Sequence, residues 1–522
     1  MPRRRPSRDA AAFAPGVGPA GATDAVLRRI EELPLLVMFA LVGSLAMLVP
    51  AAFAFLGGEA RVGRAFLYWS LLALLLCGII AATGLRRRRR PAREQLLSLL
   101  LAFSVLPLLL ALPVAATVPN TTLVSAWLEM VSAFTTTGLT LYEPARLPDA
   151  VHLWRGLIGW LGGLFVWVTA AAILRPNALG GFELENAPMR TRRMRHTRGE
   201  DVHHVGERLI RITRDLMPAY AGLSVVLALL LAAAGERPLT AVVHAMSTMS
   251  TSGISPVGGL ERGEAGIAGE VIVAMFFVFA LSRVSFAARS GSPRADPELR
   301  MAVSLILLVS AFLFARHWVG TSRSAGADGL LAAVQAFWGS IFTATSFLST
   351  TGFESTHWDS ARQWSNLQAP GIVLMGLALI GGGVATTAGG IKLLRVHALG
   401  DHALRELDRL VMPSSIGGRS YAPRAFRRRG AQIAWVFLML FAFSIAALTL
   451  GLCATGAEFA EGLTLSIAAL SNTGPLVNVT EAAVDVIELP PAAKALIAVG
   501  MVVGRMELLA IVALFNPDLW RG

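Results

Sequence analysis

Four short runs of hydroxyl-bearing residues, each ending in glycine, constrain the fold of this chain more than any other feature. They are Thr135–Gly138, Ser250–Gly253, Ser349–Gly352 and Ser471–Gly474. The four glycines stand 115, 99 and 122 residues apart, and hydrophobic segments flank every run. Each run therefore predicts one copy of a repeated unit. Four re-entrant loops around one axis are what a cation selectivity filter requires.

The composition places these runs in a membrane protein. The chain has 522 residues, of which 54% are hydrophobic and only 15% are charged, which is typical of a polytopic membrane protein. Cys77 and Cys453 both lie in apolar segments, which excludes a disulfide framework. Residues 1–32 are rich in Arg, Ala and Pro and predict a disordered cytoplasmic tail.

The hydrophobic segments predict an all-α membrane protein with ten transmembrane helices. The ten segments long enough to cross a bilayer are 34–57, 64–85, 95–118, 152–174, 209–234, 265–288, 299–319, 370–398, 430–455 and 491–516. Four shorter apolar runs lead directly into the glycine motifs: 122–134, 239–249, 331–348 and 459–470. We interpret these shorter runs as pore helices, so that each unit reads helix, pore helix, filter, helix.

This pattern divides the chain into an N-terminal part and four pseudo-repeated units around one pore. The predicted divisions are a tail (1–32), an N-terminal two-helix unit (33–94) and pore units 1 to 4 (95–198, 199–297, 298–425 and 426–522). The first two transmembrane segments stand outside the repeat.

The distribution of Lys and Arg supports this topology. With the N-terminus inside, the cytoplasmic segments hold 34 of these residues, the outer segments hold 10, and Arg283 and Arg505 lie within helices. Cytoplasmic loops of membrane proteins carry such an excess. Both termini are therefore predicted to be cytoplasmic, with all four glycine motifs at the outer side. The net charge of +12 follows from this topology, without nucleic acid as a partner.

The glycine motifs have the residue types that a dehydrated cation needs. Backbone carbonyls can replace the water shell of K⁺, and glycine adopts the unusual backbone angles that this requires. Every residue in the three positions before each glycine carries a side-chain oxygen. The predicted ion-binding residues are Thr136, Thr137, Gly138, Thr251, Ser252, Gly253, Thr350, Thr351, Gly352, Asn472, Thr473 and Gly474. Ordinary extracellular turns are the alternative, but four copies in register on one side favour a filter.

Two further features lie within the predicted helices. The stretch 381–390 contains five glycines, so it would form a poor helix and should break into a loop beneath the filter. A glycine face for close helix packing is the alternative. Arg505 lies in the middle of the last segment, where a charge should face a pore or polar cavity. A structural arginine paired with Glu507 or with backbone carbonyls is the alternative, although residues two apart face different sides of a helix.

At this point the chain resembles the TrkH/KtrB/HKT superfamily of potassium transporters, and its TrkH branch most closely. The resemblance covers roughly residues 34–522. It rests on the four glycine motifs, on the glycine-rich stretch 381–392, on the last helix with 503–509 and 515–521, and on the extra N-terminal helix pair. Glycine at all four filter positions is similar to the potassium-selective members.

The resemblance implies a potassium-translocating subunit of a bacterial uptake system in the inner membrane, with K⁺ as the transported ion and no cofactor bound to this chain. It implies a homodimer that associates with cytosolic nucleotide-binding subunits of the TrkA type. The glycine-rich loop would be the gate, and Arg505 a barrier to cations. The gate residues it implies are Gly381, Gly382, Gly383, Thr386, Thr387, Gly389, Gly390 and Lys392.

Arg283 departs from the family pattern, because family members commonly have small residues there. If it faces the cavity, it is a second barrier; alternatively it extends to the cytoplasmic surface or pairs with an acid.

Two other functions stay open. The first is a sodium-permeable or sodium-coupled transporter, since oxygen cages for the two ions differ little. The second is a polytopic membrane enzyme, which would need clustered acids or histidines at one membrane face. The outer acids are scattered without a recurring motif, so we predict no enzymatic activity.

Overall fold

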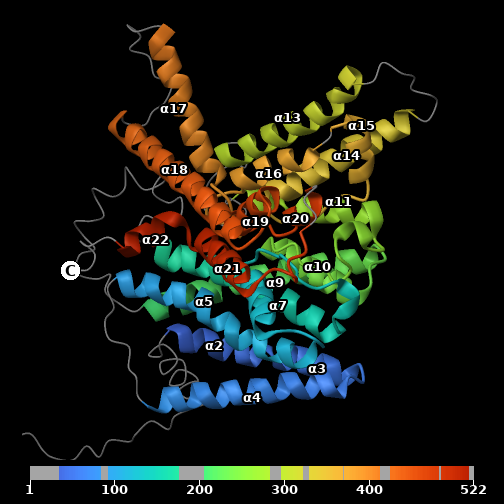
Figure 1. The fold of residues 1–522 in the computed structure, drawn as a ribbon, viewed down its shortest axis with the longest axis vertical. Helices are drawn as coiled ribbons and strands as arrows, with labels where there is room; N and C mark the ends of the chain where they lie inside the picture. Colours follow the sequence, from blue (N-terminus) through green and yellow to red (C-terminus); the bar gives the residue numbers. More distant parts are fainter. Residues whose placement is uncertain are drawn as a thin grey trace, which may run out of the picture.

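The computed structural model describes residues 35–83, 92–175, 205–282, 296–320, 329–367, 369–411, 424–480 and 484–515. Among these residues every regular element is helical, as the sequence predicts (Figure 1). The predicted tail (1–32) and Arg283 lie outside the described residues.

The order long helix, short helix, loop, second helix recurs four times. The first two sets are α5 (Ala92–Thr117), α6 (Leu123–Phe134) and α7 (Asp149–Thr169), then α9 (Val205–Ala233), α10 (Pro238–Ser250), α11 (Gly266–Phe276) and α12 (Val278–Leu281). The third set is α13 (Pro297–Gly320), α14 (Gly329–Leu348), α15 (Trp358–Ser365), α16 (Pro370–Ile380) and α17 (Leu393–Val411). The fourth is α18 (Arg424–Ala454), α19 (Phe459–Ser471), α20 (Leu476–Val479), α21 (Pro491–Met506) and α22 (Leu508–Phe515).

The four sets close into a ring. The second helix of each set packs against the short helix of the next: α7 against α10, α11 against α14, and α16 against α19. The ring closes where α21, near the end of the chain, packs against α6, near its beginning. The glycine runs follow these short helices, so this packing brings together four loops that are far apart in the sequence (Figure 1).

The N-terminal helices lie outside this ring, along one edge of the molecule (Figure 1). They are α2 (Leu35–Ala46), α3 (Leu48–Leu56) and α4 (Ala60–Ala82), and they pack against α5 and α7. The buried Ser70 hydroxyl donates to the Ser44 carbonyl at 2.7 Å, which joins α4 to α2.

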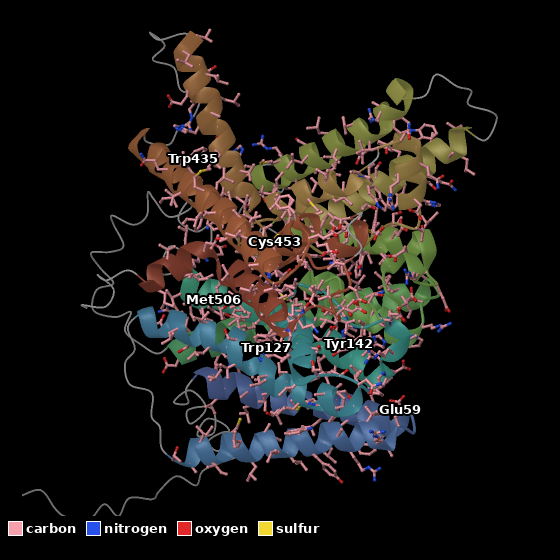
Figure 2. All side chains as sticks on the ribbon, in the orientation of Figure 1. Glu59, Trp127, Tyr142, Trp435, Cys453 and Met506 are labelled. Atoms are coloured by element: carbon pink, nitrogen blue, oxygen red, sulfur yellow. The ribbon has the colours of Figure 1, made fainter. Side chains whose placement is uncertain are left out.

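Local signals fix where the short and second helices begin. Thr122 caps α6, because its hydroxyl accepts a hydrogen bond from the Ser125 amide at 3.2 Å. Proline occupies the first position of α10, α16 and α21, where its missing N–H costs nothing. In Figure 2, Tyr142, which follows the first glycine run, lies to the right of Met506, the last residue of α21.

Eight helices of the described residues are long and apolar enough to cross a membrane. Seven of them coincide with predicted segments, and the eighth, Leu330–Leu348, lies on the run predicted as the third pore helix. The other three predicted segments contain the shorter helices α11, α16 and α21, each of which stops part-way. The count of ten crossings, and the predicted division into pore units, therefore stay predictions.

Candidate ion-binding site

All four short helices end in the same backbone arrangement. The second residue before each filter glycine has a positive φ: 53° at Thr136, 53° at Thr251, 62° at Thr350 and 53° at Asn472. Its amide, and the amide of the residue after it, each donate to a carbonyl of the last helical turn; at the first loop, Thr136 N donates to Ala133 O at 3.0 Å and Thr137 N to Ser132 O at 2.8 Å. The same two bonds occur at the other three loops.

This arrangement is a Schellman motif, and glycine normally occupies its left-handed position. A residue with a side chain in that conformation costs about 1–2 kcal/mol. Here three β-branched threonines and one asparagine adopt this unfavourable conformation at equivalent positions. Strain that recurs at four equivalent positions indicates a site where the direction of the backbone matters more than local stability.

The oxygen-bearing side chains of the loops are buried at the meeting point of the four loops. All of them are at most 1% exposed. In each of the first three loops, the hydroxyl three residues before the glycine contacts the hydroxyl one residue before it. The contacts are Thr135 with Thr137 at 2.8 Å, Ser250 with Ser252 at 3.1 Å, and Ser349 with Thr351 at 2.9 Å. Among the described residues, the buried Thr136 hydroxyl has no hydrogen-bond partner.

The filter glycines are the points of closest approach between neighbouring loops. A Cβ on Gly138 would overlap the Ser252 carbonyl oxygen, and one on Gly253 would overlap that of Thr351. A Cβ on Gly352 would meet the Pro475 ring, and one on Gly474 would overlap the Leu139 amide. The contacts therefore run from loop one to two, three, four and back to one. Only glycine fits at these positions.

The fourth loop departs from the other three. Gly138, Gly253 and Gly352 have φ values of 72°, 65° and 81°, whereas Gly474 has no positive φ. The Gly474 amide instead donates to the Thr137 carbonyl at 2.6 Å. The Asn472 side-chain amide donates to the Thr137 hydroxyl and to the Met501 carbonyl, both at 3.0 Å. Loop four is thus bonded directly to loop one.

The glycine-rich stretch breaks its helix, as the sequence predicts. The helix α16 ends at Ile380, and α17 begins at Leu393. Between them Gly381 and Gly390 have φ values of 71° and 76°, and a Cβ on Gly381 would overlap the Gly389 carbonyl. The two ends of the loop therefore pack closely together, which only residues without a side chain permit.

This loop contacts the filter loops directly. The Gly389 amide donates to the Thr350 hydroxyl at 2.8 Å, and a Cβ on Gly389 would overlap the Ser471 carbonyl. Thr386 and Thr387 are buried, and Thr387 lies 3.5 Å from the Met249 carbonyl. Gly382 and Gly383 pack against the carbonyls of Ala280 and Leu281 at the end of α12. Lys392 is buried, and its ammonium contacts the Ala388 carbonyl within the same loop.

Arg505 does not pair with Glu507. Glu507 binds Arg395 at 2.7 Å, and Arg395 lies over the Phe437 ring at 3.8 Å. Arg505 is 7% exposed, and two of its guanidinium nitrogens, Nε and Nη2, have no hydrogen-bond partner among the described residues. Glu507 has a φ of 63° where α21 ends, so the helix breaks just after Arg505.

Sequence reasoning missed a set of polar residues behind the filter. Nine residues before the glycine of loops one to three stand Glu129, His244 and Thr343. Each bonds to the segment just after its own glycine. Glu129 accepts from the Leu141 amide at 2.9 Å, His244 bonds the Ser255 hydroxyl at 2.8 Å, and Thr343 accepts from the Ser355 amide at 3.2 Å. Glu129 also lies 2.5 Å from Arg155, and both side chains are buried. Alignment on the glycines would have exposed this shared position.

Glu354 lies two residues beyond the third filter glycine. Burial, together with Glu261 and Asp359 nearby, raises the pKa of Glu354 to about 7. Burial also raises the pKa of Glu261. Among the described residues, no group of three or more His, Cys, Asp or Glu side chains could hold a metal ion.

Comparison with known proteins finds relatives that match most of this chain. The family model described as "TrkH: Cation transport protein" matches residues 301–521. The Trk system potassium uptake protein TrkH of Salmonella typhimurium is 29% identical over 478 residues, which cover 88% of this chain and 92% of that protein. Its namesake from Vibrio parahaemolyticus is 29% identical over 497 residues, which cover 92% and 96%.

A solved structure gives the same result for the fold. The crystal structure of the potassium transporter TrkH from Vibrio parahaemolyticus matches with a TM-score of 0.77 and 25% identity, and the match covers 94% of this chain and 99% of that one. The chain is thus similar in sequence and in fold to TrkH potassium transport proteins over most of its length.

These similarities confirm three predictions from the sequence. The chain has the all-helical fold of a multi-pass membrane protein. It resembles the TrkH branch of the superfamily across most of its length. Its relatives are transport proteins, which agrees with the prediction that this chain is not an enzyme.

Proposed function

We propose that this chain is the potassium-translocating membrane subunit of a bacterial K⁺ uptake system. The observation that carries the proposal is the ring of four helix ends with strained, oxygen-rich loops at equivalent positions. The names of the relatives, Trk system potassium uptake proteins, support K⁺ as the transported ion. An ion would exchange its water shell for carbonyl and hydroxyl oxygens of residues 136–138, 251–253, 350–352 and 472–474.

The short helices would favour a cation at this ring. Each of the four ends at the ring with its C-terminus, which carries a partial negative charge. The left-handed residue at the end of each helix turns the backbone, so that the next residues can present carbonyls toward the axis. The Thr136 hydroxyl, which has no hydrogen-bond partner within the described ranges, would add one more oxygen ligand.

The loop 381–392 would act as the gate. It contacts loop three through Thr350 and loop four through Ser471, so an ion leaving the filter meets this loop next. Arg505 would add an electrostatic barrier, since two of its buried nitrogens have no hydrogen-bond partner in the described parts of the chain. In the described conformation the Thr137 carbonyl is bonded to the Gly474 amide and could not also bind an ion along the same direction. We therefore interpret this conformation as closed.

The assembly follows from the same proposal. The helices α17 and α18 project from the rest of the molecule (Figure 1), and α17 exposes the apolar side chains of Leu404, Leu407 and Val411 along one face. This face supports a homodimer, while the cytosolic TrkA-type subunits would bind the regulatory nucleotide. The subunit would lie in the inner membrane, with both termini and α17 on the cytoplasmic side.

Cation flux in proteoliposomes tests the proposal. The purified protein should pass K⁺ and Rb⁺ in preference to Na⁺ and Li⁺. Equal fluxes of Na⁺ and K⁺ would overturn the potassium assignment in favour of a sodium-permeable transporter. Absence of flux for every cation, both in proteoliposomes and in cells that supply the cytosolic subunits, would overturn the transport function itself.

A further inference from the structure

Glu270 is a fully buried carboxylate beside the third filter loop, and no buried cation pairs with it among the hydrogen bonds and ion pairs of the described residues. It lies on α11, in the second set of helices, and it contacts the third set instead of its own loop. A buried carboxylate needs several donors to offset the loss of its hydration. The donors that surround Glu270 therefore indicate what it holds in place.

Four hydrogen bonds converge on Glu270. Its Oε2 accepts from the Trp338 indole nitrogen and from the Ser355 hydroxyl, both at 2.7 Å. Its Oε1 accepts from the Thr356 amide at 2.6 Å and from the Thr356 hydroxyl at 2.7 Å. Ser355 and Thr356 are the third and fourth residues after the filter glycine of loop three.

Trp338 lies on α14, the short helix that leads into the same loop. Glu270 thus joins the middle of the helix that enters the loop to the segment that leaves the loop. Both sides of loop three are tied to one carboxylate of the neighbouring set of helices, so the carboxylate fixes the loop relative to loop two.

We propose that Glu270 is a positioning residue for the ion filter, which holds loop three at the distance that K⁺ requires. The proposal rests on the proposed function. Selectivity between K⁺ and Na⁺ depends on how firmly the loops keep their oxygens at one spacing. Loops one and three lie opposite each other in the ring. Behind loop one, the buried carboxylate of Glu129, from its own short helix, accepts from the Leu141 amide and pairs with Arg155. Behind loop three, the carboxylate comes from another set of helices.

The chemistry of the donors makes the proposal testable with a substitution of nearly equal size. The Trp338 indole and the Thr356 amide can only donate, and they bind different oxygens of Glu270. In Glu270→Gln the side-chain NH₂ must face one of these two donors, whichever way the amide is turned. The exchange therefore breaks at least one strong bond and places two donors against each other.

The measurement is the K⁺/Na⁺ permeability ratio, taken from reversal potentials in proteoliposomes. We expect Glu270→Gln to lower this ratio by about tenfold, equivalent to about 1.4 kcal/mol. The control is Glu264→Gln, which removes the same charge from an exposed ion pair with Arg237 nearby and should leave the ratio unchanged.

A double variant separates positioning from simple stability. In Glu270→Gln combined with Trp338→Phe, the donor opposite Oε2 is gone, so the NH₂ group can turn there and donate to the Ser355 hydroxyl. We expect the permeability ratio to recover part of its loss. A purely structural role predicts the opposite, because Trp338→Phe removes a further buried hydrogen bond. If Glu270→Gln fails to fold, Ser355→Ala removes one of the four donors and should lower the ratio less.

The outcomes distinguish the two proposals. A wild-type protein that does not favour K⁺ overturns the proposed function. A wild-type protein that favours K⁺, with the same ratio in Glu270→Gln and in Ser355→Ala, overturns the role of Glu270 alone. A double variant with a lower ratio than Glu270→Gln also overturns it.

Discussion

Loops one and four of the filter begin identically and are then held in different ways. Both follow a short helix that ends in a Schellman motif, with Thr136 or Asn472 in the left-handed conformation. Behind loop one, Glu129 and Ser132 of its own helix bond to the segment after the glycine. The matching residues behind loop four are Leu465 and Ala468, which have no polar side-chain atoms.

This difference between loops one and four shows that the four sets can close into a ring although their loops are held by different hydrogen bonds. Loop four lacks ties to its own helix at these two positions and instead bonds to loop one through Gly474 and Asn472. Loop four is therefore held by loop one and by the Met501 carbonyl of α21, whereas loop one is bonded from behind by its own short helix. Loop four also contacts the loop 381–392, because a Cβ on Gly389 would overlap the Ser471 carbonyl.

The largest effect is expected from a side chain at the contact between loops one and two. Gly138→Ser adds a Cβ that overlaps the Ser252 carbonyl and places a serine at a φ of 72°. We expect loss of the preference for K⁺ over Na⁺ in the flux assay, by about tenfold or more. Gly222→Ala, where the added Cβ meets nothing within 4 Å, is the control. An unchanged preference would disprove the close packing of these loops.

The next effect tests whether loop one depends on its buried charge. Glu129→Gln leaves the buried Arg155 without its charged partner. The NH₂ group of the new glutamine would also lie against a second donor, either the Leu141 amide or the Arg155 guanidinium. Breaking one side of a buried ion pair costs about 3–5 kcal/mol. Thermal unfolding of the purified protein should show this loss, whereas Glu264→Gln at the surface should cost at most about 1 kcal/mol. Equal losses in the two variants would contradict the contrast between the loops.

A third variant probes the contact between loop four and the proposed gate. Gly389→Ala adds a Cβ that overlaps the Ser471 carbonyl, so it destabilises the described position of the loop 381–392. We expect a higher basal K⁺ flux, by about threefold to tenfold, because each 1.4 kcal/mol shifts a closed–open equilibrium tenfold. Gly376→Ala on α16, which meets nothing within 4 Å, should have no effect. A lower flux would argue against a gate at this position.

A smaller effect is expected from the ionisation of Glu354 beside loop three, which should make the K⁺ flux depend on pH. The pKa of Glu354 is raised to about 7 by burial and by Glu261 and Asp359, while Arg362 and Arg262 oppose the shift. The carboxyl is therefore neutral below pH 7 and charged above it, two residues from Gly352. K⁺ flux at low K⁺ concentration should rise about twofold between pH 6 and pH 8, and less at high ionic strength. Glu354→Gln should remove the rise; a rise that persists would assign it to another group.

The smallest effect should come from giving loop four a residue that loop one has. Ala468→Ser places a hydroxyl where Ser132 of loop one donates to the Leu139 carbonyl at 2.7 Å. A new bond to the Pro475 carbonyl would stabilise the protein by about 0.5–1 kcal/mol, measurable as a small rise in Tm. Ala228→Ser on α9, away from the filter, is the control. A loss of stability would indicate that loop four has no space for its own tie.

Much of the fold followed from local patterns in the sequence. Apolar runs of two lengths predicted long and short helices, and seven long segments were confirmed as helices able to span a membrane. The number of crossings was harder to predict, because α11, α16 and α21 are apolar but stop part-way. The break at Gly381 could be predicted from its glycines, whereas the break at Glu507 could not, since neither Met506 nor Glu507 is a helix breaker.

The filter positions were predicted from the repeated glycines, and their roles stay predictions. The residues behind the filter were not predicted, because a lone Glu129 or Glu270 in an apolar segment gives no sign of its partner. The partners of Glu270 lie 68 to 86 residues away along the chain. The Arg505–Glu507 pair, which helix geometry disfavoured, is replaced by the pair of Arg395 with Glu507 across 112 residues.

The sequence by itself determined most of the long helices and which four loops share one pattern, because hydrophobic length, proline and glycine act through the local backbone. The tertiary structure alone decided how the loops are held. The hydrogen bonds of Glu129, Glu270 and Asn472 depend on which helices pack side by side. Because these side chains are buried, losing such a bond costs free energy, since a buried polar group must find its partner within the protein.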